Sequence, residues 1–319
     1  LGIDLNDTED ISTKTIAQTL PSSLLLSDLI EKYCEDCIAE GSWSQTTETQ
    51  NRQSLDILQF LIGDGSCDSI DRNTARDVRE KLKHYPKNKN KNRRYKGLTM
   101  EQIMEMDDVE TIAPKTVNKN LTIYNSLFLW GKREKLVESN PFEKLKVKDN
   151  EAPGDKRSPF DKNDLRKIFG SPLYTTHDFV EPYRYWTPLI ALFSGARLNE
   201  IAQLEVTDIQ QVDDIYVFDI NDTDTKRTKN KQSIRQVPVH SKLIELGLIE
   251  YRDRLEKRGD TRLFPELTLD ARGTYSRKIS DWFNPTYLPA VGVDPSKKKF
   301  HCFRSTLAIE LEDVGTPHE

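Results

Sequence analysis

Two short segments of this chain carry side chains suited to phosphate chemistry. The first, residues 194–204, holds Arg197 with Glu200 one helical turn later, and the second holds His301 and Arg304. The planar guanidinium group of arginine pairs with two phosphate oxygens at once, and histidine can bind an anion or transfer a proton. Two arginines that converge on one anion therefore indicate a phosphate site.

Each segment is expected to begin a helix. Gly195 follows the apolar run of residues 186–193, and apolar residues then recur at helical spacing, so that Arg197 lies where a new helix begins. His301 and Arg304 are one turn apart at the start of a second predicted helix. The expected apolar side of that helix consists of Phe303, Leu307, Ile309 and Leu311. A helix N-terminus has unpaired N–H groups and a positive dipole end, which favour an anion.

Taken singly, each segment has a simpler interpretation. An arginine beside a glutamate on a helix is usually a solvated ion pair of small energy, and an isolated His-x-x-Arg is an equally weak signal. The order of the two segments and the elements around them favour the phosphate site.

Between the two segments the sequence predicts a β-hairpin. Residues 215–220 and 234–239 alternate apolar and polar side chains, and the polar residues 225–233 connect them. The basic side chains of this connection are Lys226, Arg227, Lys229 and Lys231. An exposed basic loop kept for solubility is the alternative to a functional site here.

Both segments resemble the tyrosine recombinase, or phage integrase, family. The first box of that family reads T/S-G-x-R-x-x-E-x-x-x-L-x-x-x-D, and its positions hold Ser194, Gly195, Arg197, Glu200, Leu204 and Asp208. The second box reads H-x-L-R-H-T/S and is matched by His301, Arg304 and Thr306, with Phe303 and Ser305 as departures. Residues 115–130 and 136–142 resemble the last helix and exit turn of the family's core-binding domain. The resemblance thus covers most of the chain.

The resemblance implies an active site for DNA strand cleavage and rejoining, used in site-specific recombination and integration. A tyrosine hydroxyl attacks the scissile phosphate, forms a 3′-phosphotyrosine and releases a 5′-hydroxyl that later attacks a partner strand. Arg197 and Arg304 would stabilise the phosphate, and Glu200 would orient its neighbours. His301 would assist phosphate binding or proton transfer, and no metal or other cofactor is implied.

The hairpin resembles the family's T-K-x-x-x-S-x-R-x-V-P-L element, which carries a catalytic lysine. This likeness assigns Lys229 to the lysine position, where it would protonate the leaving 5′-oxygen, and Lys226 and Lys231 remain alternatives. In the family a histidine or tryptophan and then the nucleophilic tyrosine follow the second box, but no tyrosine follows Tyr287 here. We therefore expect the nucleophile to lie outside this chain, and the fragment by itself to be inactive.

The predicted fold is mainly α with a small β-sheet, in two domains. Residues 1–20 form a polar lead-in, 21–147 a helical core-binding (SAM-like) domain, 148–157 a linker and 158–319 a C-terminally truncated catalytic domain. The helices of the first domain are expected near 24–40, 46–62, 72–83 and 115–133. Asp161 is expected to cap the first helix of the second domain, which runs through Phe169. Cys34 and Cys37 are interpreted as core or surface thiols, because no second ligand pair accompanies them.

Basic residues are concentrated in three places, although the net charge is −5. The candidate DNA-binding residues are Lys87, Lys89, Lys91, Arg93, Arg94 and Lys96 in the basic run 81–96, Lys226, Arg227 and Lys231 in the hairpin, and Lys298 and Lys299 before the second box. Contacts of this kind bind the DNA backbone in a salt-dependent way without reading sequence. The alternative for the run 81–96 is a disordered, solvated loop.

The resemblance implies that the partner is double-stranded DNA, bound by a homotetramer of the complete protein, and that an accessory directionality factor can take part. The absence of a long apolar run or signal-like N-terminus predicts a cytoplasmic protein without membrane association. The resemblance implies that the protein is encoded by a bacterium or phage and is associated with the nucleoid. Two other functions remain open: a non-catalytic DNA-binding relative, and a type IB topoisomerase-like or telomere-resolving enzyme.

Overall fold

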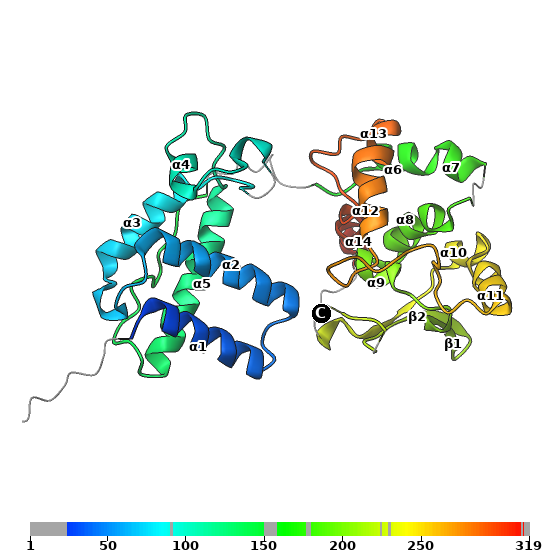
Figure 1. Cartoon of the computed structure of the whole chain (residues 1–319). Helices are drawn as coiled ribbons and strands as arrows, with labels where there is room; N and C mark the ends of the chain where they lie inside the picture. The colour runs from blue at the N-terminus through cyan, green and yellow to red at the C-terminus, as the bar shows by residue number, and fades with distance from the viewer. Residues whose placement is uncertain are drawn as a thin grey trace, which may run out of the picture. The chain divides into compact units, whose positions relative to one another are not determined.

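The computed structural model describes residues 24–89, 92–149, 158–176, 180–223, 225–228, 231–313 and 315. The chain divides into two compact units, Leu1–Asn150 and Glu151–Glu319, which are described separately (Figure 1). The predicted lead-in, residues 150–157 of the predicted linker, and the candidate residues Lys91 and Lys229 lie outside the described part. None of the helices in the described part is long and apolar enough to cross a membrane.

The first unit is built on four long helices, and they confirm the four that the sequence predicts. They are α1 (Leu26–Ala39), α2 (Gln45–Ile62), α3 (Arg72–Lys83) and α5 (Pro114–Arg133), accompanied by η1 (Cys67–Ser69), η2 (Arg93–Tyr95) and α4 (Met100–Met104). Side chains of Ser44 and Asp71 cap the starts of α2 and α3. Helix α5 packs against α1, α2 and α3, so its apolar stripe forms the centre of the core.

Cys34 and Cys37 belong to that core rather than to the surface. Both side chains are buried on α1, and burial is the main reason why the pKa of the Cys34 thiol rises to about 11. These cysteines therefore pack as neutral thiols.

The second unit is mainly helical around one small sheet. Its elements are α6 (Lys162–Phe169), α7 (Pro172–Thr175), α8 (Pro182–Ser194), α9 (Leu198–Ala202), η4 (Val206–Asp208), β1 (Ile209–Val212), β2 (Ile215–Ile220), η5 (Lys231–Ser233), β3 (Arg235–Pro238), α10 (Ser241–Glu245), α11 (Leu248–Arg258), α12 (Arg277–Trp282), η6 (Phe283–Tyr287), α13 (Leu288–Ala290) and α14 (Cys302–Asp313). Asp161 caps α6 as predicted, since its carboxylate accepts from the N–H groups of Asn163 and Asp164. The mainly helical fold with a small sheet is confirmed.

The sheet is antiparallel in the order β1-β2-β3. The predicted hairpin corresponds to β2 and β3, in which Phe218 pairs with Val237. Strand β1, in which Ile209 pairs with Phe218, was not predicted, because four residues after a short turn carry too little periodicity to be recognised. The sheet thus begins directly after the first box.

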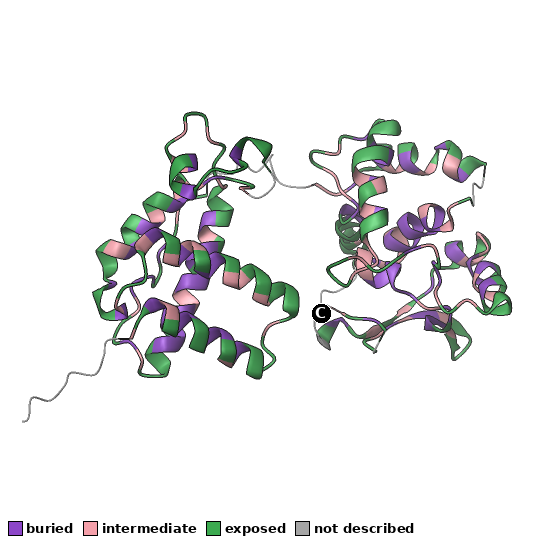
Figure 2. Ribbon diagram, in the orientation of Figure 1, coloured by how far each residue is buried: buried purple, intermediate pink, exposed green. Residues whose placement is uncertain are grey.

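Helix α8 is the central buried element of this unit, and it packs against α9, α10, α12 and α14. Figure 2 shows this helix as mostly buried. Helix α14 contributes Cys302, Phe303 and Thr306 to the buried interior. The predicted apolar side of α14 is wrong in its second half, since Ile309 and Leu311 are 42% and 43% exposed. The helix packs through its first half, which is the half that carries Arg304.

Gly195 ends α8 in a left-handed conformation, with a φ of 61°. A Cβ atom at this position would lie 3.1 Å from Leu307 Cδ2 on α14. The glycine therefore serves two needs: the positive φ and the close approach of α14.

Replacing Gly195 by alanine is expected to lower the free energy of unfolding by about 1–2 kcal/mol, because the left-handed conformation is strained for any residue with a Cβ. Gly259→Ala is the matched control: Gly259 also has a positive φ, of 80°, but a Cβ atom there would approach no other described part of the chain within 4 Å. Urea unfolding should show a larger loss for Gly195→Ala. Equal losses would show that the approach of Leu307 contributes nothing.

Candidate functional site

Arg197 is the N-cap of α9, as the sequence predicts. Its backbone N–H donates to Glu200 Oε2 over 2.9 Å, and its Nη1 donates to Glu200 Oε1 over 2.7 Å. The same Nη1 also donates to Ser233 Oγ over 2.8 Å. The guanidinium group is therefore held from two sides, by the first box and by the end of the hairpin connection, just before β3.

Glu200 is a buried carboxylate shared by two arginines. Its side chain is only 3% exposed, and Oε2 also accepts from Arg235 Nη2 over 3.0 Å. Burial alone raises the pKa of Glu200, but the hydrogen bonds from Arg197 and Arg235 outweigh it, and the pKa is lowered. The interpretation of Arg197 and Glu200 as a solvated surface pair is thus wrong.

Arg304 brings the second box to the first. It lies in the first turn of α14, and its Nη1 donates to the carbonyl oxygen of Gly195 over 2.6 Å. Burial lowers the pKa of Arg304, and so does the positive charge of Arg197 and Arg235 nearby. Arg197 and Arg235 bind the Glu200 carboxylate, and Arg304 lies near enough to interact with their charges, which leaves an excess of positive charge suited to an anion.

His301 is exposed and directly precedes α14, and its carbonyl oxygen accepts from the N–H of Arg304 over 3.2 Å. Thr306, from the same box, is buried and binds the backbone of Phe160: its Oγ accepts from the Phe160 N–H over 2.8 Å. The second box therefore places His301 on the same turn as Arg304 and uses Thr306 to attach α14 to the start of the unit.

The lysines of the hairpin have different environments. Lys226 is buried, and its Nζ lies 2.6 Å from Asp208 Oδ1 and 3.4 Å from Glu205 Oε2. Its ammonium group is therefore not presented to solvent, which the sequence did not predict. Arg227 is exposed. Lys229 lies outside the described residues, as does the side chain of Lys231.

Two residues of the site were not among the sequence-predicted ones: Arg235 and Ser233. Both occupy positions of the hairpin motif, as its serine and its arginine, but the motif by itself does not indicate their role. Only their contacts to Arg197 and Glu200 show that they belong to the site.

The two candidate lysines before the second box differ, since the fold engages the side chain of Lys298 but only the backbone of Lys299. Lys298 Nζ pairs with Asp161 over 3.2 Å and also with Asp164, and its side chain is 14% exposed. The backbone N–H of Lys299 donates to Cys302 Sγ over 3.3 Å. Lys298 thus stabilises the start of α6 through its capping carboxylates.

The described part of the basic run is folded, contrary to the disordered-loop alternative. Tyr95 is buried, and the N–H of Lys87 donates to the carbonyl of Glu110 over 2.7 Å. Lys87 Nζ also pairs with Glu110 Oε1 over 2.5 Å, and Arg94 Nη2 donates to the carbonyl of Asp107 over 3.1 Å. Arg93 and Lys96 are exposed.

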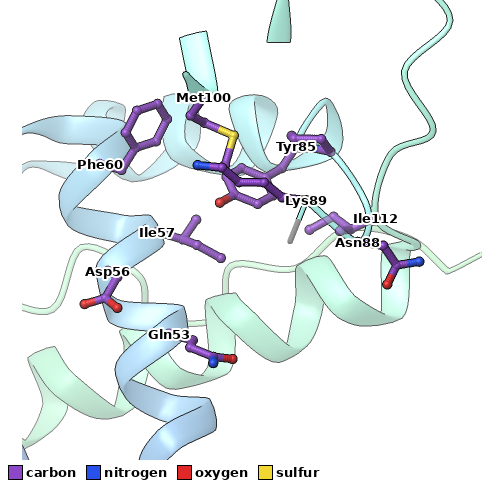
Figure 3. A pocket seen from close by; sticks show the side chains of 10 residues that line it. Gln53, Asp56, Ile57, Phe60, Tyr85, Asn88, Lys89, Met100 and Ile112 are labelled. Atoms are coloured by element: carbon purple, nitrogen blue, oxygen red, sulfur yellow. The ribbon is translucent and has the colours of Figure 1, made fainter. Parts of the chain in front are cut away.

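Lys89 lines a cavity of about 550 Å³ in the first unit (Figure 3). Its apolar lining includes Ile57 and Phe60 of α2 and Met100 of α4, while Asn88 and Lys89 contribute polar atoms. Phe60 is 40% exposed, so an apolar surface directly adjoins the basic run.

The chain is similar to DNA-bound integrases of known structure. No protein-family model and no curated protein matches it. The Tn1549 transposon integrase in complex with a circular intermediate DNA aligns over 92% of this chain and 89% of its own, with 16% identity and a TM-score of 0.60. A lambda integrase dimer bound to a COC′ core site aligns over 92% and 88%, with 12% identity and a TM-score of 0.61.

A lambda integrase tetramer bound to a Holliday junction aligns over 92% of this chain and 75% of its own, with 14% identity and a TM-score of 0.59. These identities are too low to carry more than the architecture. The chain has the fold of the Tn1549 and lambda integrases, which confirms at the level of the fold the resemblance to the tyrosine recombinases.

Proposed function

We propose that this protein is a tyrosine recombinase that binds double-stranded DNA and cleaves and rejoins its strands through a 3′-phosphotyrosine. The observation that carries the proposal is the convergence of Arg197 and Arg304 on one site around the buried carboxylate of Glu200. The similar integrases from Tn1549 and lambda have been solved in complex with DNA, which supports a DNA substrate.

In the proposed reaction a tyrosine oxygen forms a bond to the scissile phosphorus while the bond to the 5′-oxygen breaks. Arg197 and Arg304 hold the non-bridging oxygens and stabilise the charge of the pentacoordinate transition state. Lys229 donates a proton to the leaving 5′-oxygen, and His301 assists phosphate binding or proton transfer. The second step reverses these bonds, with the 5′-hydroxyl of a partner strand as the nucleophile.

The fixed geometry of Arg197 supports its role. Glu200 and Ser233 hold its guanidinium group before DNA arrives, so less side-chain entropy is lost when the phosphate binds. Arg235 also pairs with Glu200 and so neutralises part of its negative charge. The positive charges of Arg197 and Arg304 are therefore not fully neutralised and can bind the phosphate.

We further propose that residues 21–147 form a DNA-binding domain, 148–157 a linker and 158–319 the catalytic domain. The exposed Arg93 and Lys96 of the basic run are the side chains best placed to meet phosphates, and Lys87 would have to exchange Glu110 for DNA. A tetramer on DNA is supported by the assembly of the similar lambda integrase. The proposal includes an accessory directionality factor as a protein partner.

The proposal is tested by trapping the covalent intermediate. A duplex selected for binding from a random DNA pool, nicked near the bound site, is incubated with the full-length protein and separated on a denaturing gel. We expect a protein–DNA adduct with a 3′-phosphotyrosine, identified by mass spectrometry, and the joining of two duplexes that carry the site. Binding without an adduct would favour a non-catalytic relative, and relaxation of supercoils without joining would favour a topoisomerase.

The basic run should contribute salt-dependent DNA affinity. Reversing the charge at Lys87, Lys89 and Arg93 to glutamate is expected to weaken binding and to flatten the plot of log K against log salt, by about 0.9 for each phosphate that is no longer neutralised. Titrations at several salt concentrations measure both effects. Reversal of Lys32, Lys135 and Lys144, which lie elsewhere on the first unit, is the matched control. Equal effects in the two variants would point to total charge rather than to this surface.

A further inference from the structure

A buried ion pair fixes the first half of the hairpin connection to the first box. Lys226 Nζ lies 2.6 Å from Asp208 Oδ1, and both side chains are almost fully buried. Asp208 also accepts from the backbone N–H of Glu205 over 2.7 Å and from Asn221 Nδ2 over 3.1 Å. A buried carboxylate with three donors is well compensated, and loss of the ammonium group would leave it short of a positive charge.

Further contacts strengthen the same region. Thr225 Oγ donates to Glu205 Oε1 over 2.9 Å, and Arg262 Nη2 donates to the carbonyl of Thr225 over 3.1 Å. Arg262 also lies over the ring of Tyr275, 4.0 Å from its centroid. Side chains from separate segments therefore converge on Thr225 and Lys226.

Backbone hydrogen bonds also stabilise this segment. The N–H groups of Thr223 and Lys226 each donate to the carbonyl of the other residue, over 3.2 Å and 3.1 Å. The N–H of Arg227 then donates to Gln203 Oε1 over 3.2 Å. We call the described residues among 223–227 the first anchor.

The second half of the connection has an anchor of its own. Ser233 Oγ accepts from Arg197, and Arg235 pairs with Glu200. We call Ser233 and Arg235 the second anchor. Both anchors are bound by the first box. Glu205 and Asp208 bind the first anchor, and Arg197 and Glu200 bind the second.

We infer that Lys226 is a positioning residue: its buried pair with Asp208 fixes the start of the connection against the first box, and proton transfer during cleavage depends on that fixed start. This inference rests on the proposed function, in which Lys229 is the proton donor. Lys226 itself is engaged by Asp208 and Glu205 and is not the proton donor.

The first test needs no activity. Lys226→Met removes the charge but keeps an unbranched side chain, and it should release the backbone pair of the first anchor. Amide hydrogen exchange of the free full-length protein should then show faster exchange at Thr223 and Lys226 than in the wild type, with slow exchange retained in α8. Lys242→Met is the control, because Lys242 forms an exposed pair with Glu245. Unchanged protection in Lys226→Met would overturn the inference.

Lys226→Met could unfold the unit more widely, in which case α8 would also lose protection. Thr225→Val is the milder variant for that case, since it removes the hydrogen bond to Glu205 Oε1 and leaves the charges in place. It should speed exchange at the first anchor alone. If this variant too leaves the anchor unchanged, the inference is overturned.

The second test separates positioning from a general loss of structure. A DNA substrate with sulfur in place of the bridging 5′-oxygen has a leaving group that needs no proton donor, because thiols ionise near pH 8.5 and alcohols far above it. Lys226→Met and Lys229→Ala should each slow cleavage of normal DNA, by about 10- to 100-fold, and cleave the sulfur substrate at nearly the wild-type rate. Their effects on normal DNA should not add in the double variant.

Other combinations of cleavage rates on the two substrates would contradict the inference or the proposed function. If Lys229→Ala cleaves normal DNA at the wild-type rate while Lys226→Met does not, Lys226 is the proton donor and the inference is wrong. If Lys226→Met slows both substrates equally, the pair serves the phosphate clamp or the fold, and the inference is again wrong. If wild-type protein cleaves neither substrate, the proposed function fails, while the exchange experiment still decides whether Lys226 holds the anchor.

Discussion

Replacing Arg197 or Arg304 by alanine is expected to slow DNA strand cleavage at least about a hundredfold, the usual cost of losing one donor to a developing oxyanion. The two residues come from segments far apart in sequence and meet in one positively charged site. In the proposed function both guanidinium groups contact the same phosphate, so the double variant should lose less than the product of the two single effects. The measurement is the single-turnover rate of adduct formation on nicked DNA.

The fold should survive both changes. The Arg304 side chain donates one described hydrogen bond to protein, to the carbonyl of Gly195, and such a bond contributes about 1 kcal/mol to stability. Arg277→Ala is the control, since Arg277 is 69% exposed and pairs with an equally exposed Asp281. Variants that unfold at nearly the wild-type urea concentration but fail to cleave support the phosphate clamp. Near-normal cleavage in both single variants would refute it.

Replacing Glu200 by glutamine is expected to lower the free energy of unfolding by about 2 kcal/mol at neutral pH, because two arginines lose the charge that they share. Both arginines are about one-third exposed, so water screens part of the loss. Cleavage should slow as well, since Arg197 loses its charged partner and keeps only the hydrogen bond to Ser233 at full strength. Glu245→Gln, which alters an exposed pair, is expected to change stability little.

The stability difference should depend on pH in one direction. The pKa of Glu200 in the folded protein is lowered from its usual 4.5, so the folded state favours the charged carboxylate. Its contribution is fully present above pH 4.5 and disappears as the pH falls through the lowered pKa. Wild type and Glu200→Gln should therefore converge in stability in acid. A constant difference across this range would show that the charge of Glu200 is not what stabilises the site.

The sequence alone determined the main elements and the identity of the two boxes. Helix periodicity located α1, α2, α3 and α5, and the cap at Asp161 and the helix start at Arg197 were readable from neighbouring residues. These features depend on contacts within a few residues, which is why local spacing predicts them. The spacing of residues in the two boxes also identified Arg197, Glu200, His301 and Arg304 as candidate site residues.

Only the tertiary structure showed which charged side chains are exposed and which are buried in ion pairs within the protein. Sequence spacing could not show that Glu200 is buried between Arg197 and Arg235, or that Arg304 reaches the carbonyl of Gly195. The sequence predicts that Lys226 contacts DNA, but in the structure this lysine is buried and pairs with Asp208. Burial and pairing arise from segments packed together over long sequence distances, and a charged residue has the same letter whether it faces solvent or a buried partner.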